Sequence, residues 1–217
     1  MLDTNLIDKA TNILRNGGIV VFPTETVYGL GASAYNEQAV RRIFTIKARP
    51  HNNPIIVHVA TIEQVNVVVA NIPASAKNLM ATFWPGPLTI VLPCSSRISQ
   101  VVTGGLTTVA VRMPDHPVAS TLIRSLGEPI AAPSANRSGR PSPTRVEHVH
   151  REFGKDVDMV LDGGTCRIGL ESTVIDMSTD IPCILRSGSI TSNMIRSAIG
   201  QITSHEPSHR TTAPNHR

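Results

Sequence analysis

Aromatic residues are scarce in this 217-residue chain, making up 3% of the sequence although 41% of it is hydrophobic. The core must therefore consist mainly of Val, Ile, Leu and Ala side chains. Such β-branched richness favours strands that are buried on both faces of a sheet. A chain of this length is typical of one large domain and buries roughly 70% of its unfolded surface, so folding requires neither a metal nor a disulfide.

Cysteines are also few, and the three present, Cys94, Cys166 and Cys183, lie far apart without any C-x-x-C pair. This spacing argues against a disulfide framework or a zinc ribbon and is typical of a reducing compartment. No apolar run approaches the roughly 20 residues of a membrane span. The N-terminal segment contains acidic residues and is unlike a signal or transit peptide. We therefore expect a cytoplasmic protein without a membrane partner.

Dense runs of basic residues are absent as well, although the formal net charge is +4. A positive balance fits nucleic-acid binding, and it fits equally a few cations placed to hold an anionic small molecule. Phe and Tyr never alternate with basic residues, as they would in a platform that stacks bases. We interpret the charge as that of a moderately basic surface.

The chain does contain a succession of apolar patterns with helical and strand periodicity. The predicted helices cover residues 4–16, 37–49, 73–84, 116–127, 145–154 and 191–199. The predicted strands cover residues 19–22, 54–60, 88–93, 108–114, 129–135, 157–164, 172–178 and 183–188. Because helices and strands alternate, with consecutive strands at 87–113 and 171–188, we predict an α/β fold with a mixed sheet. The polar tail, residues 203–217, has no periodicity and is predicted to be disordered.

Polar residues gather in five stretches at the ends of predicted strands, where open α/β sheets bind ligands. The stretches are residues 23–31 (PTETVYGLG), 47–58, 107–112, 133–142 and 171–190. They supply guanidinium, ammonium, hydroxyl and amide groups but few carboxylates. Arginine and lysine recognise carboxylate and phosphate groups, so this inventory favours a ligand rich in negative charge. It offers no carboxylate cage for a metal, so Mg²⁺ would be carried by phosphates and water.

Several motifs that would indicate other chemistry are missing. The sequence has no G-x-x-x-x-G-K-[ST] phosphate loop, no G-x-G-x-x-G opening a helix and no G-x-S-x-G nucleophile turn. His148 and His150 lie two positions apart, so their side chains diverge on a helix and do not form a zinc pair. Each polar stretch also has a purely structural interpretation as a turn, a helix end or a hydrophilic loop. Spacing alone therefore indicates only a protein that binds an anionic metabolite.

Six blocks of sequence together carry a family resemblance. They are PTETVYGLG, KARPHNNPIIVH, TVAVRMPDHP, APSANRSGRPSPT, ESTVID and ILRSGSI. In order and separation they resemble the YrdC-type threonylcarbamoyl-AMP synthases, over nearly the whole chain from about Ile7 to Ile199. The family's K-x-R and S-x-N pairs are matched by Lys47, Arg49, Ser134 and Asn136.

The resemblance implies a fold and a reaction. The fold is a twisted, mixed β-sheet with flanking helices around a deep electropositive cavity, in a YrdC-like catalytic domain spanning residues 1–202. The family condenses L-threonine, bicarbonate or CO₂, and ATP to L-threonylcarbamoyladenylate and pyrophosphate. That product serves the N6-threonylcarbamoylation of adenosine 37 in tRNA, through a tRNA threonylcarbamoyl-transferase complex. Binding of tRNA or double-stranded RNA by the domain itself is expected to be weak and secondary.

The resemblance also carries site residues over by motif. The L-threonine pocket is expected to use Thr26, His58, Arg112, Ala132 and Ser172. The ATP site is expected to use Arg49, Asn53, Thr108, Ser134, Ser142 and Arg186. Lys47, Arg49, Ser134 and Asn136 are assigned to the catalytic centre, and we expect the charges of Lys47 and Arg49 to be solvent-accessible. No metal ligand is assigned among the side chains, and the Pro23–Gly31 turn is expected to form a wall of the pocket.

Three other readings of the sequence are open. One is an RNA-binding YrdC-like protein without synthase activity, whose binding should weaken steeply with salt and be indifferent to threonine. Another is the carbamoyl-transfer domain of hydrogenase maturation proteins, which carry acylphosphatase and zinc-finger regions that this chain has no room for. The third is a YrdC-like paralogue of unsettled activity. Such paralogues tend to lose the K-x-R or S-x-N pair, and this sequence keeps both.

Overall fold

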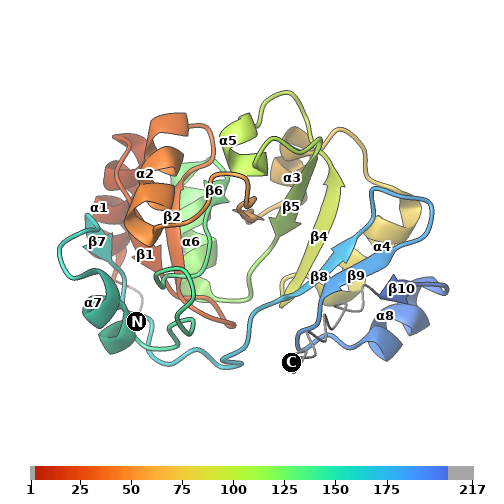
Figure 1. The fold of residues 1–217 in the computed structure, drawn as a ribbon. Coiled ribbons are helices and arrows are strands. Elements are labelled where there is room, and N and C mark those ends of the chain that lie inside the picture. Colours follow the sequence, from red (N-terminus) through yellow and green to blue (C-terminus); the bar gives the residue numbers. More distant parts are fainter. Residues whose placement is uncertain (1–2, 205–217) are drawn as a thin grey trace, which may run out of the picture.

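The computed structural model describes residues 3–204, and the part of the predicted tail from residue 205 onward lies outside them. Within the described residues, one mixed sheet has the strand order β10-β9-β8-β4-β5-β3-β6-β2-β1-β7, with helices on both sides (Figure 1). The predicted α/β fold with a mixed sheet and flanking helices is therefore confirmed. No helix in residues 3–204 has both the length and the apolar character that crossing a membrane requires.

The strands are short, and their bounds follow the chain. They are β1 (Val20–Phe22), β2 (Gly29–Ser33), β3 (Val57–His58), β4 (Leu88–Pro93), β5 (Thr108–Arg112), β6 (Ile130–Ala131), β7 (Met159–Val160), β8 (Thr173–Asp176), β9 (Cys183–Arg186) and β10 (Thr203–Ser204). The sheet is mixed, because β3 pairs with β5 in parallel while β5 pairs with β4 in antiparallel fashion, and β3, β6, β2 and β1 form successive antiparallel pairs. Thr203 and Ser204, the first two residues of the predicted tail, pair with β9.

Eight helices lie within residues 3–204. They are α1 (Thr4–Arg15), α2 (Glu37–Lys47), α3 (Ile62–Val68), α4 (Ala74–Phe83), α5 (Gln100–Thr103), α6 (Pro117–Leu126), α7 (Val146–Phe153) and α8 (Ser192–Ile199). The short helices α3 and α5 were not predicted from the sequence. The strand predicted at 54–60 reduces to the two residues of β3, and Pro54, which has no N–H to donate, lies before it.

Successive side chains from Ile19 to Phe22, just before and within β1, point alternately into two separate apolar cores. Val20 and Phe22 pack in one core with residues of α1 and α6. Ile19 and Val21 belong to the other core, together with residues of α2, α4, α7 and α8. Since successive residues of a strand point to opposite faces, this pattern places two layers of helices around the sheet. The sheet centre is thus buried on both faces, and the polar stretches lie where its strands end.

Side-chain caps fix where the first two helices begin. The Asp3 carboxylate accepts a hydrogen bond from the backbone N–H of Asn5, and the Asn36 side chain accepts one from Ala39 N–H. At the other end of α2, Ala48 has a left-handed backbone with φ of 49° and ψ of 46°. This conformation costs a non-glycine residue roughly 1–2 kcal/mol. It breaks the helix between Lys47 and Arg49 and turns the two side chains apart.

Candidate functional site

A cavity of about 250 Å³ is lined by residues from all five polar stretches. Sequence-predicted residues on its wall are Thr26, Arg49, Asn53, His58, Arg112, Ala132, Ser134, Ser172 and Arg186. Two backbone pairings explain part of the convergence. His58 and Arg112 are register partners on the parallel strands β3 and β5, and Gly29 forms a bridge with Ser134. Segments distant in sequence therefore meet beside the central strands of the sheet.

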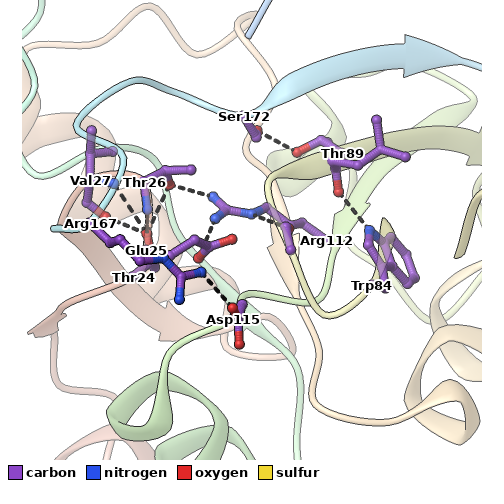
Figure 2. A network of polar contacts seen from close by, with 12 residues as sticks. Thr24, Glu25, Thr26, Val27, Trp84, Thr89, Arg112, Asp115, Arg167 and Ser172 are labelled. Atoms are coloured by element: carbon purple, nitrogen blue, oxygen red, sulfur yellow. Dashed lines mark hydrogen bonds and ion pairs between the residues drawn. The ribbon is translucent and has the colours of Figure 1, made fainter. Parts of the chain in front are cut away.

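The turn after β1 is held rigid by the Thr24 hydroxyl (Figure 2). Its Oγ1 accepts from the N–H groups of Thr26 and Val27, each at 3.2 Å, and donates to the Val27 carbonyl at 2.6 Å. The Thr26 hydroxyl lies 2.9 Å from it and accepts a bond from Arg112 Nη1 at 2.8 Å. This turn forms part of the cavity wall, as the sequence indicated.

Arg112 is buried, and each of its three guanidinium nitrogens contacts one protein oxygen, which leaves further N–H groups available. Its Nη2 lies 2.7 Å from Glu25 Oε2, and its Nε donates to the Gly86 carbonyl at 3.3 Å. Burial lowers the pKa of Arg112, an effect that the Glu25 carboxylate opposes. Glu25 is 1% exposed, and the sequence reasoning assigned it no role. A lone acid between two threonines, directly after an apolar strand, was the signal that could have marked it.

His58 is a neutral side chain in this wall. Burial, followed by the nearby Arg112 charge, lowers the pKa of His58 to about 3, so the imidazole is uncharged near neutral pH. The edge of its ring meets the Phe22 ring at 5.8 Å between centroids. Within the described residues its buried Nδ1 has no hydrogen-bond partner. His58 can therefore hydrogen-bond a ligand, but it cannot act as a base on an ammonium group.

Two further arginines line the cavity. Arg49 donates from Nη2 to Asn53 Oδ1 at 2.7 Å and to the Pro54 carbonyl at 2.8 Å. Arg186 donates from Nε to the Ser172 carbonyl and from Nη2 to its hydroxyl. Burial lowers the pKa of Arg49, and the Arg186 charge lowers it further. Neither has an ion-pair partner within 4.0 Å in the described part of the chain, so an anion bound between them would relieve their repulsion.

Lys47 does not line the cavity, and the expectation that its charge is solvent-accessible is wrong. Its side chain is 1% exposed, and Nζ donates to the backbone carbonyls of Ser134 and Asn136. The reason is the left-handed turn at Ala48, which leaves Lys47 on the helix while Arg49 reaches the cavity. Lys47 thus fixes the backbone of the S-x-N segment from behind.

Three other predicted site residues, Asn136, Ser142 and Thr108, do not line the cavity. Asn136 is buried, and its amide donates to the carbonyls of Arg137 and Arg140. Ser142 donates to Oε1 of Glu171, which does line the cavity. Thr108 begins β5 opposite Pro93, at the far end of the strand from Arg112. Ser142 therefore adjoins the cavity through Glu171, whereas Thr108 does not border it.

Ser172 lies on the cavity wall in contact with Thr89 and Arg186. Its hydroxyl lies 2.7 Å from Thr89 Oγ1, and it also accepts the bond from Arg186. Gly188 packs directly against this backbone. A Cβ atom there would lie 2.5 Å from Thr173 N and 2.7 Å from the Glu171 carbonyl oxygen. No side chain fits unless the segment that carries Ser172 shifts.

We expect Gly188→Ala to lower the free energy of unfolding by about 1–3 kcal/mol, as overpacking usually does. It should also weaken ligand binding, because Ser172 and its partner Arg186 move. Denaturant unfolding measures the first effect and calorimetry the second. The control is Ser189→Ala, next in the chain and exposed. A Gly188→Ala protein as stable as this control would contradict the expected clash.

The side chains that line the cavity can bind and orient charged ligands. The described residues contain no group of three or more His, Cys, Asp or Glu side chains placed to hold a metal ion. Glu171 is a lining carboxylate, and it already accepts from Ser142. The cavity thus has an Arg112–Thr26 end and an Arg49–Arg186 end, with hydroxyl and amide groups between them. This arrangement suits an acidic ligand held beside a second, more highly charged one.

Comparison with known proteins agrees with this geometry. The Sua5/YciO/YrdC family model, described as "Telomere recombination", matches residues 12–188. The threonylcarbamoyl-AMP synthase of Pyrococcus abyssi is 52% identical over 196 residues, covering 90% of this chain and 58% of its own length. That of Bacillus subtilis is 52% identical over 197 residues, covering 90% of this chain and 57% of its own.

A solved structure shows the same fold. The crystal structure of Pyrococcus abyssi Sua5 complexed with L-threonine superposes with a TM-score of 0.93 at 50% identity, covering 94% of this chain and 60% of that one. The chain therefore spans less than two thirds of the length of these relatives. The family model's match over residues 12–188 nevertheless includes every segment that lines the cavity.

Proposed function

Because the chain belongs to the Sua5/YciO/YrdC family, we propose that it acts as a threonylcarbamoyl-AMP synthase. It would condense L-threonine, bicarbonate or CO₂, and ATP to L-threonylcarbamoyladenylate and pyrophosphate. The observation that carries the proposal is the meeting of Arg49, Arg112 and Arg186 around one cavity. The relatives' names and the threonine complex of the Pyrococcus abyssi protein support it.

Threonine would occupy the end of the cavity formed by Arg112, Thr26 and His58. The free N–H groups of the Arg112 guanidinium match a planar carboxylate, and the turn at Thr24 keeps the Thr26 hydroxyl in place. Neutral His58 offers a hydrogen bond without adding charge. Ala132 and Ser172 complete this end of the wall.

ATP would occupy the opposite end, with its phosphates between Arg49 and Arg186. Two guanidinium groups that repel each other gain from a polyanion, and within the described residues only the Glu171 carboxylate, which forms no direct ion pair with them, offsets the charge of Arg186. The remaining residues of this end are Asn53 and Ser134 on the wall, and Ser142 behind Glu171. Mg²⁺ would enter as the MgATP complex, because the described side chains offer no dedicated ligand set.

The reaction needs little covalent chemistry from the protein. The neutral amine of threonine attacks CO₂ and releases a proton to solvent water, which gives a carbamate. A carbamate oxygen then attacks the α-phosphorus of ATP, and the bond to pyrophosphate breaks. Holding the reactants in line supplies about 7–11 kcal/mol in well-oriented cases. Arg49 and Arg186 would stabilise the charge that develops on the phosphoryl oxygens.

We assign Lys47 a positioning role in this scheme, in place of direct contact with the reacting atoms. Its Nζ holds the carbonyls of Ser134 and Asn136, and Ser134 is the residue that reaches the cavity. The product would pass to a tRNA threonylcarbamoyl-transferase complex, and we propose that step from the family alone. Binding of RNA by the domain itself is secondary, and the test below separates it from synthesis.

The decisive experiment incubates the protein with ATP, Mg²⁺, bicarbonate and L-threonine and measures pyrophosphate release. We expect release that needs both threonine and bicarbonate. Release that ignores threonine would point to another acceptor, and absence of release would contradict the synthase assignment. If the protein instead retained RNA in a salt-dependent manner without release, the RNA-binding alternative would stand.

We expect Arg49→Ala to lower kcat/KM for ATP by about 10²–10³-fold, the usual cost of losing one preorganised charge donor. The fold should be retained, because the Arg49 side chain bonds only its own loop. Pyrophosphate release at varied ATP measures the effect. Arg41→Ala is a matched control, since Arg41 lies on α2, the helix that precedes the Arg49 loop, in an exposed pair with Glu37. Equal activity of the two variants would remove Arg49 from the ATP site.

A further inference from the structure

The Glu25 carboxylate is a buried charge that the reaction scheme leaves unused. It is 1% exposed, and it does not line the cavity although Thr24 and Thr26 on either side do. It therefore lies behind the wall, against Arg112 (Figure 2). A buried carboxylate is costly unless a cation compensates it, so its position calls for a reason.

Arg112 is the cation that compensates this carboxylate. His116 and Arg167 also face Glu25, but the Arg167 guanidinium is exposed and binds Asp115 Oδ2 at 2.6 Å. Burial lowers the pKa of His116, so the imidazole is predominantly neutral near pH 7. By contrast, Arg112 Nη2 approaches Glu25 Oε2 to 2.7 Å with both side chains buried. The pair is therefore locally neutral.

Because of this pairing, the local net charge differs between the Arg112 end of the cavity and the Arg49–Arg186 end. The charges of Arg49 and Arg186 have no ion-pair partner within 4.0 Å among the described residues, although the Glu171 carboxylate on the same wall partly offsets the charge of Arg186. The charge of Arg112 is balanced from behind by Glu25. A phosphate group gains most where cations are uncompensated, whereas a zwitterion of zero net charge gains little from net charge and much from fixed donors.

We propose that Glu25 is a specificity-determining residue. By neutralising Arg112 from behind, its carboxylate makes that end of the cavity accept a zwitterionic α-amino acid and reject phosphate-type anions. The proposal rests on the proposed function for the identity of the amino acid. It also assigns Glu25 a second effect, since the ion pair holds the guanidinium plane in which Nη1 bonds Thr26 and Nε bonds Gly86.

The test is Glu25→Gln, which keeps the shape of the side chain and removes its charge. Inorganic phosphate is the probe, with the competition pattern as readout. In the unaltered protein phosphate should compete with ATP and leave the KM for threonine nearly unchanged. In Glu25→Gln, phosphate should also compete with threonine and raise its apparent KM at least tenfold at a concentration that leaves the unaltered protein's threonine KM constant. Equal competition patterns in the two proteins would overturn the proposal.

A matched control is Asp115→Asn, which removes a nearby negative charge from an exposed pair. It should leave the phosphate pattern unchanged. A shift as large as that of Glu25→Gln would mean that any local charge suffices, and the specific role of Glu25 would be refuted. A second variant, Glu25→Gln/Arg112→Met, removes both charges and should lose the competition between phosphate and threonine.

A binding measurement keeps the inference independent of catalysis. Calorimetry with phosphate, in a background of Arg49→Ala/Arg186→Ala, reports only the Arg112 end. Binding should appear when Glu25→Gln is added and be absent without it. If the unaltered protein showed no threonine-dependent release, the synthase proposal would fail while this measurement still decided the role of Glu25. If Glu25→Gln does not fold, we expect added phosphate to restore its folding and Glu25→Gln/Arg112→Met to fold without phosphate. Failure of either expectation would refute the inference.

Discussion

Arg112→Ala is expected to lower the free energy of unfolding by about 3–5 kcal/mol, because it leaves a buried carboxylate without its partner. The uncompensated group is Glu25, 1% exposed and within 2.7 Å of the guanidinium that is removed. The same change should raise the KM for threonine far more than the KM for ATP, since Arg112 is the group proposed to bind the threonine carboxylate. Denaturant unfolding and initial rates of pyrophosphate release measure the two effects.

The double variant Glu25→Ala/Arg112→Ala separates these effects. Removing both charges should restore much of the lost stability, whereas the KM for threonine should stay high because the carboxylate-binding group is still missing. Equal stability losses in the single and double variants would show that the pair is not the cause. A threonine KM that remained normal in Arg112→Ala would remove this arginine from the amino-acid end.

The convergence of the site was predictable because polar stretches followed strand ends. Each of the five stretches reaches the cavity wall, and the sheet that brings them together is mixed as predicted, although β2 (Gly29–Ser33) was not among the predicted strands. Ligand-type residues at strand ends thus carried the information about where a site would form. The helices α3 and α5 escaped prediction because each spans two turns or fewer, too short for a helical period to show.

Whether a charged side chain lies on the cavity wall or behind it was not predictable from the sequence. Lys47 and Arg49 stand two positions apart and read as a pair of cations at a helix end. Ala48 separates them by adopting φ of 49°, and alanine gives no sequence signal for that conformation. Glu25 was missed for a related reason. Its partner Arg112 is 87 positions later in the chain, so only the tertiary structure shows that the carboxylate is buried against it.

Lys47→Met is expected to lower kcat/KM by about 10²-fold even though Lys47 touches no part of the cavity. Its Nζ supplies donors to the carbonyls of Ser134 and Asn136, and Met supplies none. Each buried carbonyl left without a donor costs about 1–3 kcal/mol, so the S-x-N segment should shift. A displacement of about 1 Å at a substrate-positioning group is enough for such a loss. Lys77→Met, at an exposed lysine of α4, is the control.

The pH dependence of stability distinguishes this role from a simple loss of packing. Burial, with a contribution from Arg49, lowers the pKa of Lys47 from 10.5 to about 7. Between these two values the unfolded chain binds the proton that the folded chain has released, so this group makes stability rise as pH increases from about 7 to about 10.5. Lys47→Met should lack that rise, and its stability deficit should be larger at pH 9 than at pH 6. Parallel stability profiles for the unaltered protein and Lys47→Met would show that the Lys47 ammonium is not desolvated, and Lys47 would then belong with the solvent-facing cations of the cavity.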